Sequence, residues 1–195
     1  MEAEPSYFPP DWLPAGRQSA TDLDLAVLLV NSVDLLADPP DRLDDLQWLQ
    51  AAFTQAGHAG TVVDLADADL PRLRALRAAL RTAFEAESAA AAADALNPVL
   101  DASRAVLQLT PDSGADTYSV VVGSGRKGIA ALEARLPAAL AAHIAAHGPT
   151  TLGVCASDPC RCAFVDRTRG RTRRYCCSYC NDRAAARAYR RRRKA

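Results

Sequence analysis

All six cysteines of this 195-residue chain lie close together near its end, at Cys155, Cys160, Cys162, Cys176, Cys177 and Cys180. Structural zinc sites use four ligands in a tetrahedron, usually supplied as two close pairs separated by a loop. Cys155 and Cys160 form one close pair, and Cys176 and Cys180 form the other with a spacing that puts both sulfurs on one helix face. These four cysteines are the predicted ligands, and Zn²⁺ is the predicted cofactor.

The two remaining cysteines leave the ligand set open. Cys162 could replace Cys160, and Cys177 forms a competing pair with Cys180. Free or disulfide-bonded thiols are the other interpretation. A segment this small has too little core to fold alone, whereas a structural zinc ion contributes on the order of 10–16 kcal/mol to such a peptide. We therefore expect a chelator to unfold residues 150–195 and to leave the preceding domain intact.

The charge of the chain is divided sharply at this point. Residues 1–150 carry ten Lys and Arg against twenty Asp and Glu, a net −10, whereas residues 151–195 carry thirteen against three, a net +10. Such asymmetry predicts a polyanionic partner for the basic part, or contact between the two parts.

The first residues favour a cytoplasmic protein. The acidic start has no signal-peptide layout, and the longest early apolar run, Leu25 to Val30, is far too short to span a bilayer. We expect no membrane contact. Thiols stay reduced in the cytoplasm, so clustered cysteines there more often hold a metal than form disulfides.

Hydrophobic periodicity predicts a mainly α protein in three parts. An irregular arm (residues 1–20) precedes a helical domain with a small β-hairpin (21–148), and a small zinc-bound finger with a basic helix follows (149–195). The expected helices run from Thr21 to Leu36, from Asp41 as N-cap to Gly57, from Asp69 to Phe84, from Asp94 to Leu107 and from Ile129 to Ile144, with strands at 106–110 and 118–122. Residues 26–30 also allow a short β-strand.

Several polar signals in the helical domain have plain structural interpretations. The helix from Asp69 carries a basic outer face, which we interpret as solvated, with anion binding as the alternative. Gly123 to Gly128 fits GxGxxG, but no βαβ series surrounds it, so a glycine-rich connector is favoured. His143 and His147 could hold a metal by their spacing, yet the polar end of an amphipathic helix explains them equally well. The arginines of the basic face are Arg72, Arg74, Arg77 and Arg81. No catalytic set is visible, so we expect the protein not to be an enzyme.

Arginines surround the second cysteine pair. Arg183, Arg187 and either Arg190 or Arg191 recur on one helical face, which continues the face of Cys176. Four more come from the loop between the pairs, at Arg169, Arg171, Arg173 and Arg174. A helix fixed at its start by zinc could present such a row to phosphates or to a groove, so DNA is the predicted partner. The alternative is a solubilising tail, or a tail that pairs with the acidic domain.

The cysteine-rich segment resembles the CGNR-type zinc finger of bacterial stress-induced transcription regulators. The matching positions are Phe164, Asp166, Thr168, Arg169, Arg173, Arg174, Tyr175-Cys176 and Cys180-Asn181-Asp182-Arg183. Tyr175 stands where the family usually has Trp, Asn181-Asp182 replaces Gly-Asn, and Cys162 and Cys177 are additional cysteines.

The segment from Asp24 to Ser32 resembles the ABATE domain, the helical domain commonly attached to this finger. The resemblance implies a transcription regulator whose N-terminal domain senses a small ligand. The alternative is a zinc-held protein-interaction or redox-sensing module in which Cys162 and Cys177 are reactive thiols. RNA binding is a third interpretation. The sequence shows neither an operator nor a dimer seam.

Overall fold

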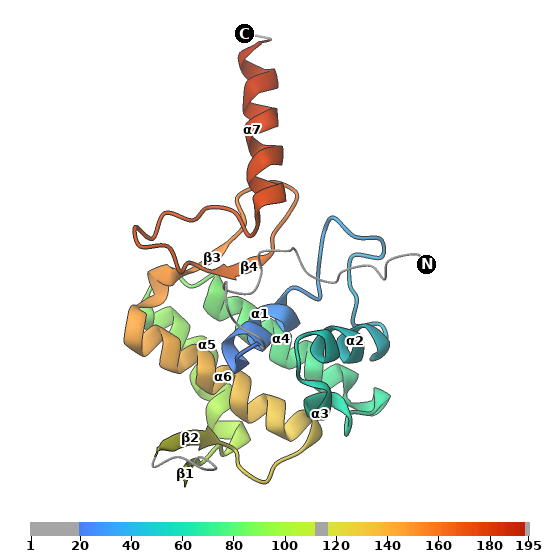
Figure 1. The fold of residues 1–195 in the computed structure, drawn as a ribbon, viewed down its shortest axis with the longest axis vertical. Coiled ribbons are helices and arrows are strands. Elements are labelled where there is room, and N and C mark those ends of the chain that lie inside the picture. Colours follow the sequence, from blue (N-terminus) through green and yellow to red (C-terminus); the bar gives the residue numbers. More distant parts are fainter. Residues whose placement is uncertain (1–19, 112–116, 194–195) are drawn as a thin grey trace.

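The computed structural model describes residues 20–111 and 117–193, so the expected arm lies outside the described residues except for Ala20. Four helices form the centre of the molecule: α1 (Asp22–Val30), α4 (Leu70–Phe84), α5 (Ala89–Ser103) and α6 (Gly128–His147). Figure 1 shows this bundle in the lower part of the molecule, with a small sheet above it and a single helix projecting away. The expectation of a mainly α protein is confirmed.

Helix α1 begins where the sequence predicts and ends earlier. Thr21 caps its start, and the side chain of Asp24 accepts hydrogen bonds from the Thr21 backbone (2.9 Å) and hydroxyl (2.7 Å). The expected continuation to Leu36 is wrong, because the helix stops at Val30 and Asn31 turns its side chain to a distant backbone. Residues 31–46 form a connecting segment instead, and residues 26–30 are helical rather than β.

The second expected helix is shorter than its pattern suggested. Helix α2 (Gln47–Gln55) starts six residues after Asp41, which is therefore not its N-cap. The Asp41 carboxylate instead binds Arg77 of α4 through two hydrogen bonds of 2.6 and 2.7 Å. Gly57 ends the segment with φ of 84°, a conformation that suits glycine. The short α3 (Ala59–Val62) and the 3₁₀ turn η1 (Asp67–Asp69) lead into α4.

Helix α4 has the predicted buried stripe, with Pro71 in its first turn. Its stripe consists of Leu70, Leu73, Leu76, Leu80 and Phe84. The interpretation of its basic face as solvated holds for Arg72 and Arg74, which are exposed, whereas Arg77 and Arg81 are half-buried. All four arginines also bind partners within the chain. These pairs are Arg72 with Glu133, Arg74 with the Leu43 carbonyl, Arg77 with Asp41, and Arg81 with Glu85 and the Arg161 carbonyl.

Helix α5 is one continuous helix, with Ser88 as its N-cap and Pro98 inside it, so the expected start at Asp94 is wrong. It ends at Ser103, and Leu107 belongs to a strand. The predicted hairpin is present, with β1 (Leu107–Pro111) antiparallel to β2 (Tyr118–Val122). The GxGxxG segment then links β2 to α6 as a tight turn in which three glycines have positive φ.

Helix α6 is long and apolar enough, by length and composition alone, to cross a membrane. It packs against α1, α4 and α5, and Leu132, Leu136 and Leu140 are fully buried, so it has the character of a core helix. At its end, His143 bonds the Thr151 hydroxyl (2.8 Å), and its ring contacts that of His147 in a tilted arrangement, with ring centroids 4.8 Å apart.

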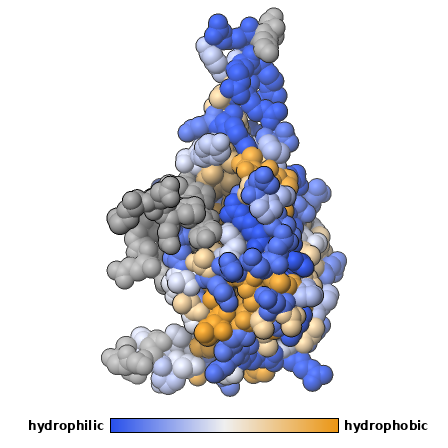
Figure 2. Space-filling view, turned by 90° about the vertical axis from the view of Figure 1, so that its right-hand side faces the viewer, coloured by the Kyte–Doolittle hydropathy of each residue, from blue (hydrophilic) through white to orange (hydrophobic). Residues whose placement is uncertain are grey.

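The C-terminal part begins with the 3₁₀ turn η2 (Pro149–Thr151), followed by an antiparallel hairpin of β3 (Leu152–Val154) and β4 (Ala163–Val165). The hairpin packs on α1 and α4, and Ala163 and Val165 belong to the same apolar core as the helical domain. Helix α7 (Ser178–Arg192) then leaves the body of the molecule (Figure 1). The face of this projecting part that Figure 2 shows is mostly hydrophilic. The finger is therefore docked at its base and free at its tip.

Candidate metal centre

Four cysteine sulfurs meet between the β3–β4 hairpin and the start of α7. The Sγ atoms of Cys155, Cys160, Cys176 and Cys180 all lie within 4.8 Å of one another. These are the four that the sequence spacing selects. The expectation that Cys176 and Cys180 share a helix face is wrong, because Cys176 precedes α7, which begins at Ser178. Three of the side chains are buried and the fourth, Cys176, is half-buried. Among the described residues, no other group of three or more His, Cys, Asp or Glu side chains brings its ligand atoms together in this way.

The spacing of the sulfurs suits a tetrahedral metal. A zinc–sulfur bond of about 2.3 Å implies sulfur–sulfur edges of about 3.8 Å in a regular tetrahedron. The Sγ–Sγ distances are 3.7 Å from Cys160 to Cys176 and 3.7 Å from Cys176 to Cys180. Four soft donors at these separations have the composition and the size of a structural zinc site.

The electrostatics of the cluster also call for a cation. Hydrogen bonds from Cys162 and Cys176 hold the pKa of the Cys160 thiol well below its usual range. The contact with Cys160 raises the pKa of Cys162 to about 12 and also raises the pKa of Cys176. Burial, together with the charge of Cys160, raises the pKa of Cys180. These shifts favour a thiolate at Cys160 over one at Cys162, Cys176 or Cys180, and a cation among the sulfurs would stabilise further thiolates there.

The extra cysteines lie beside this group. Cys162 is within interaction range of Cys160 and Cys176, and the Cys177 sulfur is 3.8 Å from that of Cys176. Cys177 occupies the N-cap position of α7, and its own carbonyl accepts from the Asn181 amide at 3.2 Å. Neither belongs to the set of four that are mutually close.

Backbone hydrogen bonds hold the two cysteine pairs in place. The Cys155 amide donates to the Cys162 carbonyl (2.9 Å) and closes the hairpin, and the Cys160 amide donates to the Ser157 carbonyl (2.9 Å). The Ala156 amide donates to the Arg174 carbonyl (3.0 Å). This bond joins the first cysteine pair to the backbone that directly precedes the second pair. Both pairs are therefore fixed to one another by the backbone as well as by their sulfurs.

Asp166 organises the loop between the pairs. Its buried carboxylate accepts hydrogen bonds from the Thr168 amide (2.8 Å), the Thr168 hydroxyl (2.6 Å) and the Arg173 amide (2.8 Å). Burial would raise the pKa of Asp166, but these hydrogen bonds outweigh it and hold the pKa below its usual value. The Phe-x-Asp-x-Thr-Arg pattern thus has a structural basis: it folds the loop that carries the arginines.

Phe164 forms the floor of this loop. It lies opposite Gly153 in the hairpin, and a Cβ atom at Gly153 would come within 2.6 Å of the ring. The Arg173 guanidinium lies 5.2 Å from the centroid of the same ring and donates to the Tyr175 carbonyl (2.9 Å) and the Cys176 carbonyl. Arg173 therefore connects the apolar floor to the backbone of a cysteine in the cluster.

The predicted nucleic-acid-binding arginines divide into two groups. Arg183 donates to the carbonyl and hydroxyl of Ser157, and Arg187 bonds the Asp158 carbonyl (2.9 Å) and carboxylate (3.1 Å). Arg183 and Arg187 thus hold the loop between Cys155 and Cys160, called the metal loop below, from α7. Arg173 braces the start of the second cysteine pair from the long loop of residues 166–175. Sequence periodicity places Arg183 and Arg187 on one face correctly, but it cannot show that this face turns toward the 155–160 loop.

The other predicted arginines face outward. Arg174 lies over the Tyr175 ring, 5.9 Å from its centroid. Apart from Arg174, four of the predicted arginines form no side-chain hydrogen bond or ion pair within residues 20–111 and 117–193, and all four are exposed: Arg169, Arg171, Arg190 and Arg191. Two of these lie on the long loop and two near the free end of α7.

Contacts with the helical domain fix the other side of the finger, and residue patterns did not reveal them. Asn31 bonds the backbone of Ala163 on β4, and Arg167 forms an ion pair with the buried carboxylate of Asp24. Burial by itself would raise the pKa of Asp24. Hydrogen bonds from Thr21 and the charge of Arg167 together outweigh this effect, so the pKa of Asp24 lies below its ordinary value. The one sequence signal was the resemblance of the Asp24–Ser32 segment, which contains both contact residues.

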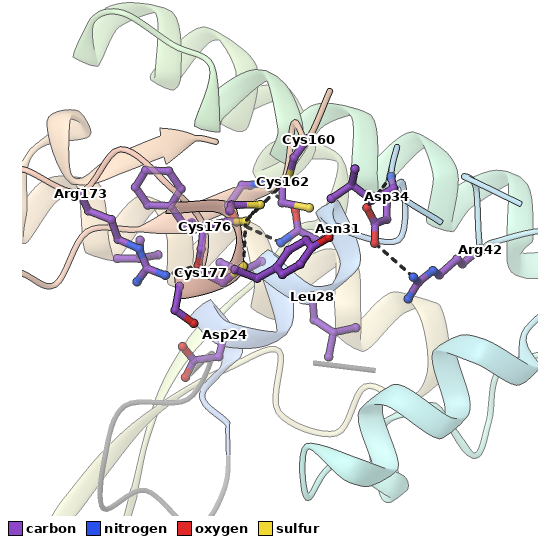
Figure 3. A pocket seen from close by; sticks show the side chains of 18 of the residues that line it. Asp24, Leu28, Asn31, Asp34, Arg42, Cys160, Cys162, Arg173, Cys176 and Cys177 are labelled. Atoms are coloured by element: carbon purple, nitrogen blue, oxygen red, sulfur yellow. Dashed lines mark hydrogen bonds and ion pairs between the residues drawn. The ribbon is translucent and has the colours of Figure 1, made fainter. Parts of the chain in front are cut away.

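A cavity of about 440 Å³ lies between the two parts of the molecule, directly beside the sulfurs. Figure 3 shows Asp24, Leu28, Asn31, Asp34 and Arg42 of the helical domain around this cavity, with the cysteines and Arg173 of the finger. The cysteine cluster is therefore one wall of a cavity whose opposite wall is formed by α1 and the segment that follows it.

Fold and site together define a helical domain joined to a four-cysteine finger with a projecting basic helix. Residues 23–152 match the family model ABATE, described as "Putative stress-induced transcription regulator", and residues 151–193 match that of the CGNR zinc finger. The chain belongs to the ABATE family and carries a CGNR zinc finger, as the resemblance predicted. A comparison with curated proteins found no match.

Proposed function

We propose that this protein is a zinc-dependent, DNA-binding transcription regulator. In this proposal Cys155, Cys160, Cys176 and Cys180 hold Zn²⁺, which fixes the first turn of α7 to the body of the finger. The bound ion would have a structural role and no catalytic one, since all four positions of the tetrahedron are filled by the protein. The protein would act by binding and not as an enzyme.

The observation that carries the proposal is the position of α7. The helix is anchored at Cys180 and by Arg183 and Arg187, and beyond these residues it extends away from the molecule (Figure 1). A free-standing helix whose last turn carries Arg190, Arg191 and Arg192 buries no apolar face of its own. Such a helix is suited to the major groove or to the phosphates that flank it.

The arginines are assigned separate roles in this proposal. Arg190 and Arg191 on the helix, with Arg169, Arg171 and Arg174 on the long loop, would contact DNA. The bracing residues are Arg173, Arg183 and Arg187, whose guanidinium groups already bind the start of the second cysteine pair or the metal loop. An arginine that already has carbonyl partners gains less from a phosphate than an arginine without partners does.

The remaining parts of the proposal concern the cell. The ABATE domain would sense a small effector and adjust the finger during stress. The protein would work in the cytoplasm of a bacterium, on the nucleoid when it is bound to DNA. Support for the regulatory role comes from the family description, and support for communication between the parts comes from the shared core that joins them.

Selection of bound fragments from a random duplex library tests the proposal. The zinc-loaded full chain should enrich a sequence motif, whereas the Cys176→Ser variant should enrich none. An RNA library selected in parallel separates DNA binding from RNA binding. Absence of any enriched duplex motif with the zinc-loaded chain, at low and at moderate salt, would contradict sequence-specific DNA binding.

A redox-sensing module is the second candidate, and the position of Cys162 favours it. This thiol lies within interaction range of Cys160 and Cys176 and faces the cavity. Hydrogen peroxide would accept two electrons from the Cys162 thiol and the zinc-bound Cys176 thiolate, which form a disulfide and release Zn²⁺. The Cys162 proton and one proton from solvent complete the two water molecules. Peptide mapping after peroxide treatment tests this. Zinc release that leaves Cys162 unmodified excludes the mechanism.

A further inference from the structure

The interface between the ABATE domain and the finger contains a cavity of about 440 Å³, a size typical of small-molecule sites. Twelve of its twenty lining residues belong to the finger and eight to the helical domain. Small-molecule sites occur preferentially at such junctions between domains. A ligand in this cavity would touch α1, the 31–46 segment and the first turn of α7 at the same time.

Charged groups in the wall are already paired. Arg42 binds Asp34 at 3.2 Å, and Arg167 binds Asp24. The third arginine of the wall, Arg173, donates to the Tyr175 and Cys176 carbonyls and lies over the Phe164 ring. A charged ligand would compete with these existing partners, and a broken ion pair would leave the released group partly buried without compensation. The cavity therefore favours a neutral occupant.

The remaining surface is apolar and aromatic. Val27, Leu28 and Leu36 contribute aliphatic surface, and Trp48 and Tyr179 contribute rings from opposite sides of the interface. Cysteine sulfurs line the finger side (Figure 3). Aromatic rings and sulfur atoms both contact an aromatic ligand favourably. The chemical class that fits is a neutral, mostly apolar aromatic molecule.

We infer that this interdomain cavity is the effector site, and that it takes a neutral aromatic small molecule whose binding is linked to the position of α7. The inference rests on the proposed function, because an effector needs a regulated activity. The link follows from the wall itself, since Ser178, Tyr179 and Cys180 belong both to the cavity and to the base of α7. A ligand that contacts them better in one position of α7 shifts the balance between positions.

The test uses the zinc-loaded full chain and N-phenyl-1-naphthylamine, a neutral probe that fluoresces in apolar surroundings. Saturable binding with one probe per chain is expected. The matched anionic probe, 8-anilinonaphthalene-1-sulfonate, should bind at least ten-fold more weakly. Absence of saturable binding, or an anionic probe that binds equally well, overturns the inference.

Two neighbouring leucines provide a matched pair of variants. Leu36 lines the cavity and is 43% exposed, whereas Leu35 is 46% exposed and does not line it. Leu36→Asp should weaken binding of the neutral probe at least ten-fold, and Leu35→Asp should leave it unchanged. Equal effects of the two substitutions overturn the site. Probe binding that appears only after deletion of residues 1–19 would mean that these residues occupy the cavity in the full chain. That outcome also overturns the inference.

The link to DNA is measured by repeating the probe titration with a saturating duplex taken from the fragment selection. A several-fold change in probe affinity is expected, and an unchanged affinity overturns the effector role. Duplex binding without any probe tests the proposed function separately. A protein that binds the duplex but not the probe keeps the proposed function and loses only this inference.

Discussion

The side chain of Asn31 pairs with the backbone of Ala163 as a neighbouring strand would. The Ala163 amide donates to Oδ1 at 2.7 Å, and Nδ2 donates to the Ala163 carbonyl at 3.0 Å. Asn31 sits at the C-cap of α1, in the helical domain, and Ala163 begins β4 in the finger. One amide group therefore satisfies the outer edge of a two-stranded sheet and joins the two parts of the molecule.

Loss of this pair should weaken the whole protein. Asn31→Ala would leave the buried donor and acceptor of Ala163 without partners, at a cost of about 1–3 kcal/mol. We expect a lower free energy of unfolding by chemical denaturation and faster amide exchange in β4. Asn97→Ala, on the exposed face of α5, is the matched control and should cost less than about 0.5 kcal/mol. Equal effects would show that the pairing contributes nothing specific.

The same pairing marks the limit of prediction from sequence. The cysteine pairs, the α4 stripe and the hairpin are local patterns, in which residues a few positions apart share one face or one turn. The end of α1 is not local. The apolar pattern continues to Leu36, but a hydrogen-bonding partner 132 residues away takes the side chain of Asn31.

The arginines give the same lesson for the site. Helical periodicity places Arg183 and Arg187 on one face, but the loop they bind is contributed by Ser157 and Asp158, whose position depends on the cysteine cluster. The basic face of α4 likewise resembles a solvated face until its acidic partners are placed around it. Residue type and spacing therefore identify the candidate groups, and only the three-dimensional fold separates the bracing arginines from those free to bind.

Metal removal should release the tip of the finger rather than all of residues 150–195. Ala163 and Val165 belong to the core of the helical domain, so the β3–β4 hairpin keeps apolar contacts that do not depend on the metal. We expect a chelator to expose residues 166–193 to amide exchange while most helical signal remains. Complete loss of protection in β4 would restore the simpler expectation of an independent finger.

Single cysteine substitutions should identify the ligands. Cys176→Ser is expected to abolish stoichiometric zinc, because Cys176 lies at the 3.7 Å edges shared with Cys160 and Cys180. Cys162→Ser should retain one zinc per chain, since Cys162 is outside the group of four. Zinc content by elemental analysis of purified protein decides this. Zinc lost from Cys162→Ser but kept by Cys160→Ser would assign Cys162 as the ligand instead.

The ion pair between Asp24 and Arg167 should make stability depend on pH. The folded pKa of Asp24 lies below its ordinary 3.8, so its contribution is fully present above that value and is lost as pH falls through the folded pKa. Asp24→Asn should therefore destabilise the protein near pH 7, by about 2 kcal/mol for a charge-assisted hydrogen bond. The difference from the unsubstituted protein should shrink below about pH 4.

Asp22→Asn is the control for this measurement. Asp22 lies in the same helical turn and pairs with Arg135, but its side chain is 30% exposed whereas that of Asp24 is 2% exposed. A more exposed pair contributes less, so a smaller loss is expected. A constant difference between Asp24→Asn and the unsubstituted protein across pH 3–7 would show that the charge of Asp24 is not the source of its effect.

Two classes of arginine substitution should separate DNA contact from bracing. If about five outward arginines reach phosphates, log K should fall with log salt at a slope of about −4 to −5. The double substitution Arg190→Gln, Arg191→Gln should reduce the slope by about two, with an unchanged melting temperature, because neither side chain has a partner among the described residues. Arg183→Gln should instead lower the melting temperature, because Ser157 loses its guanidinium partner. A melting temperature unaffected by Arg183→Gln, with a reduced salt slope, would move Arg183 into the DNA-contacting group.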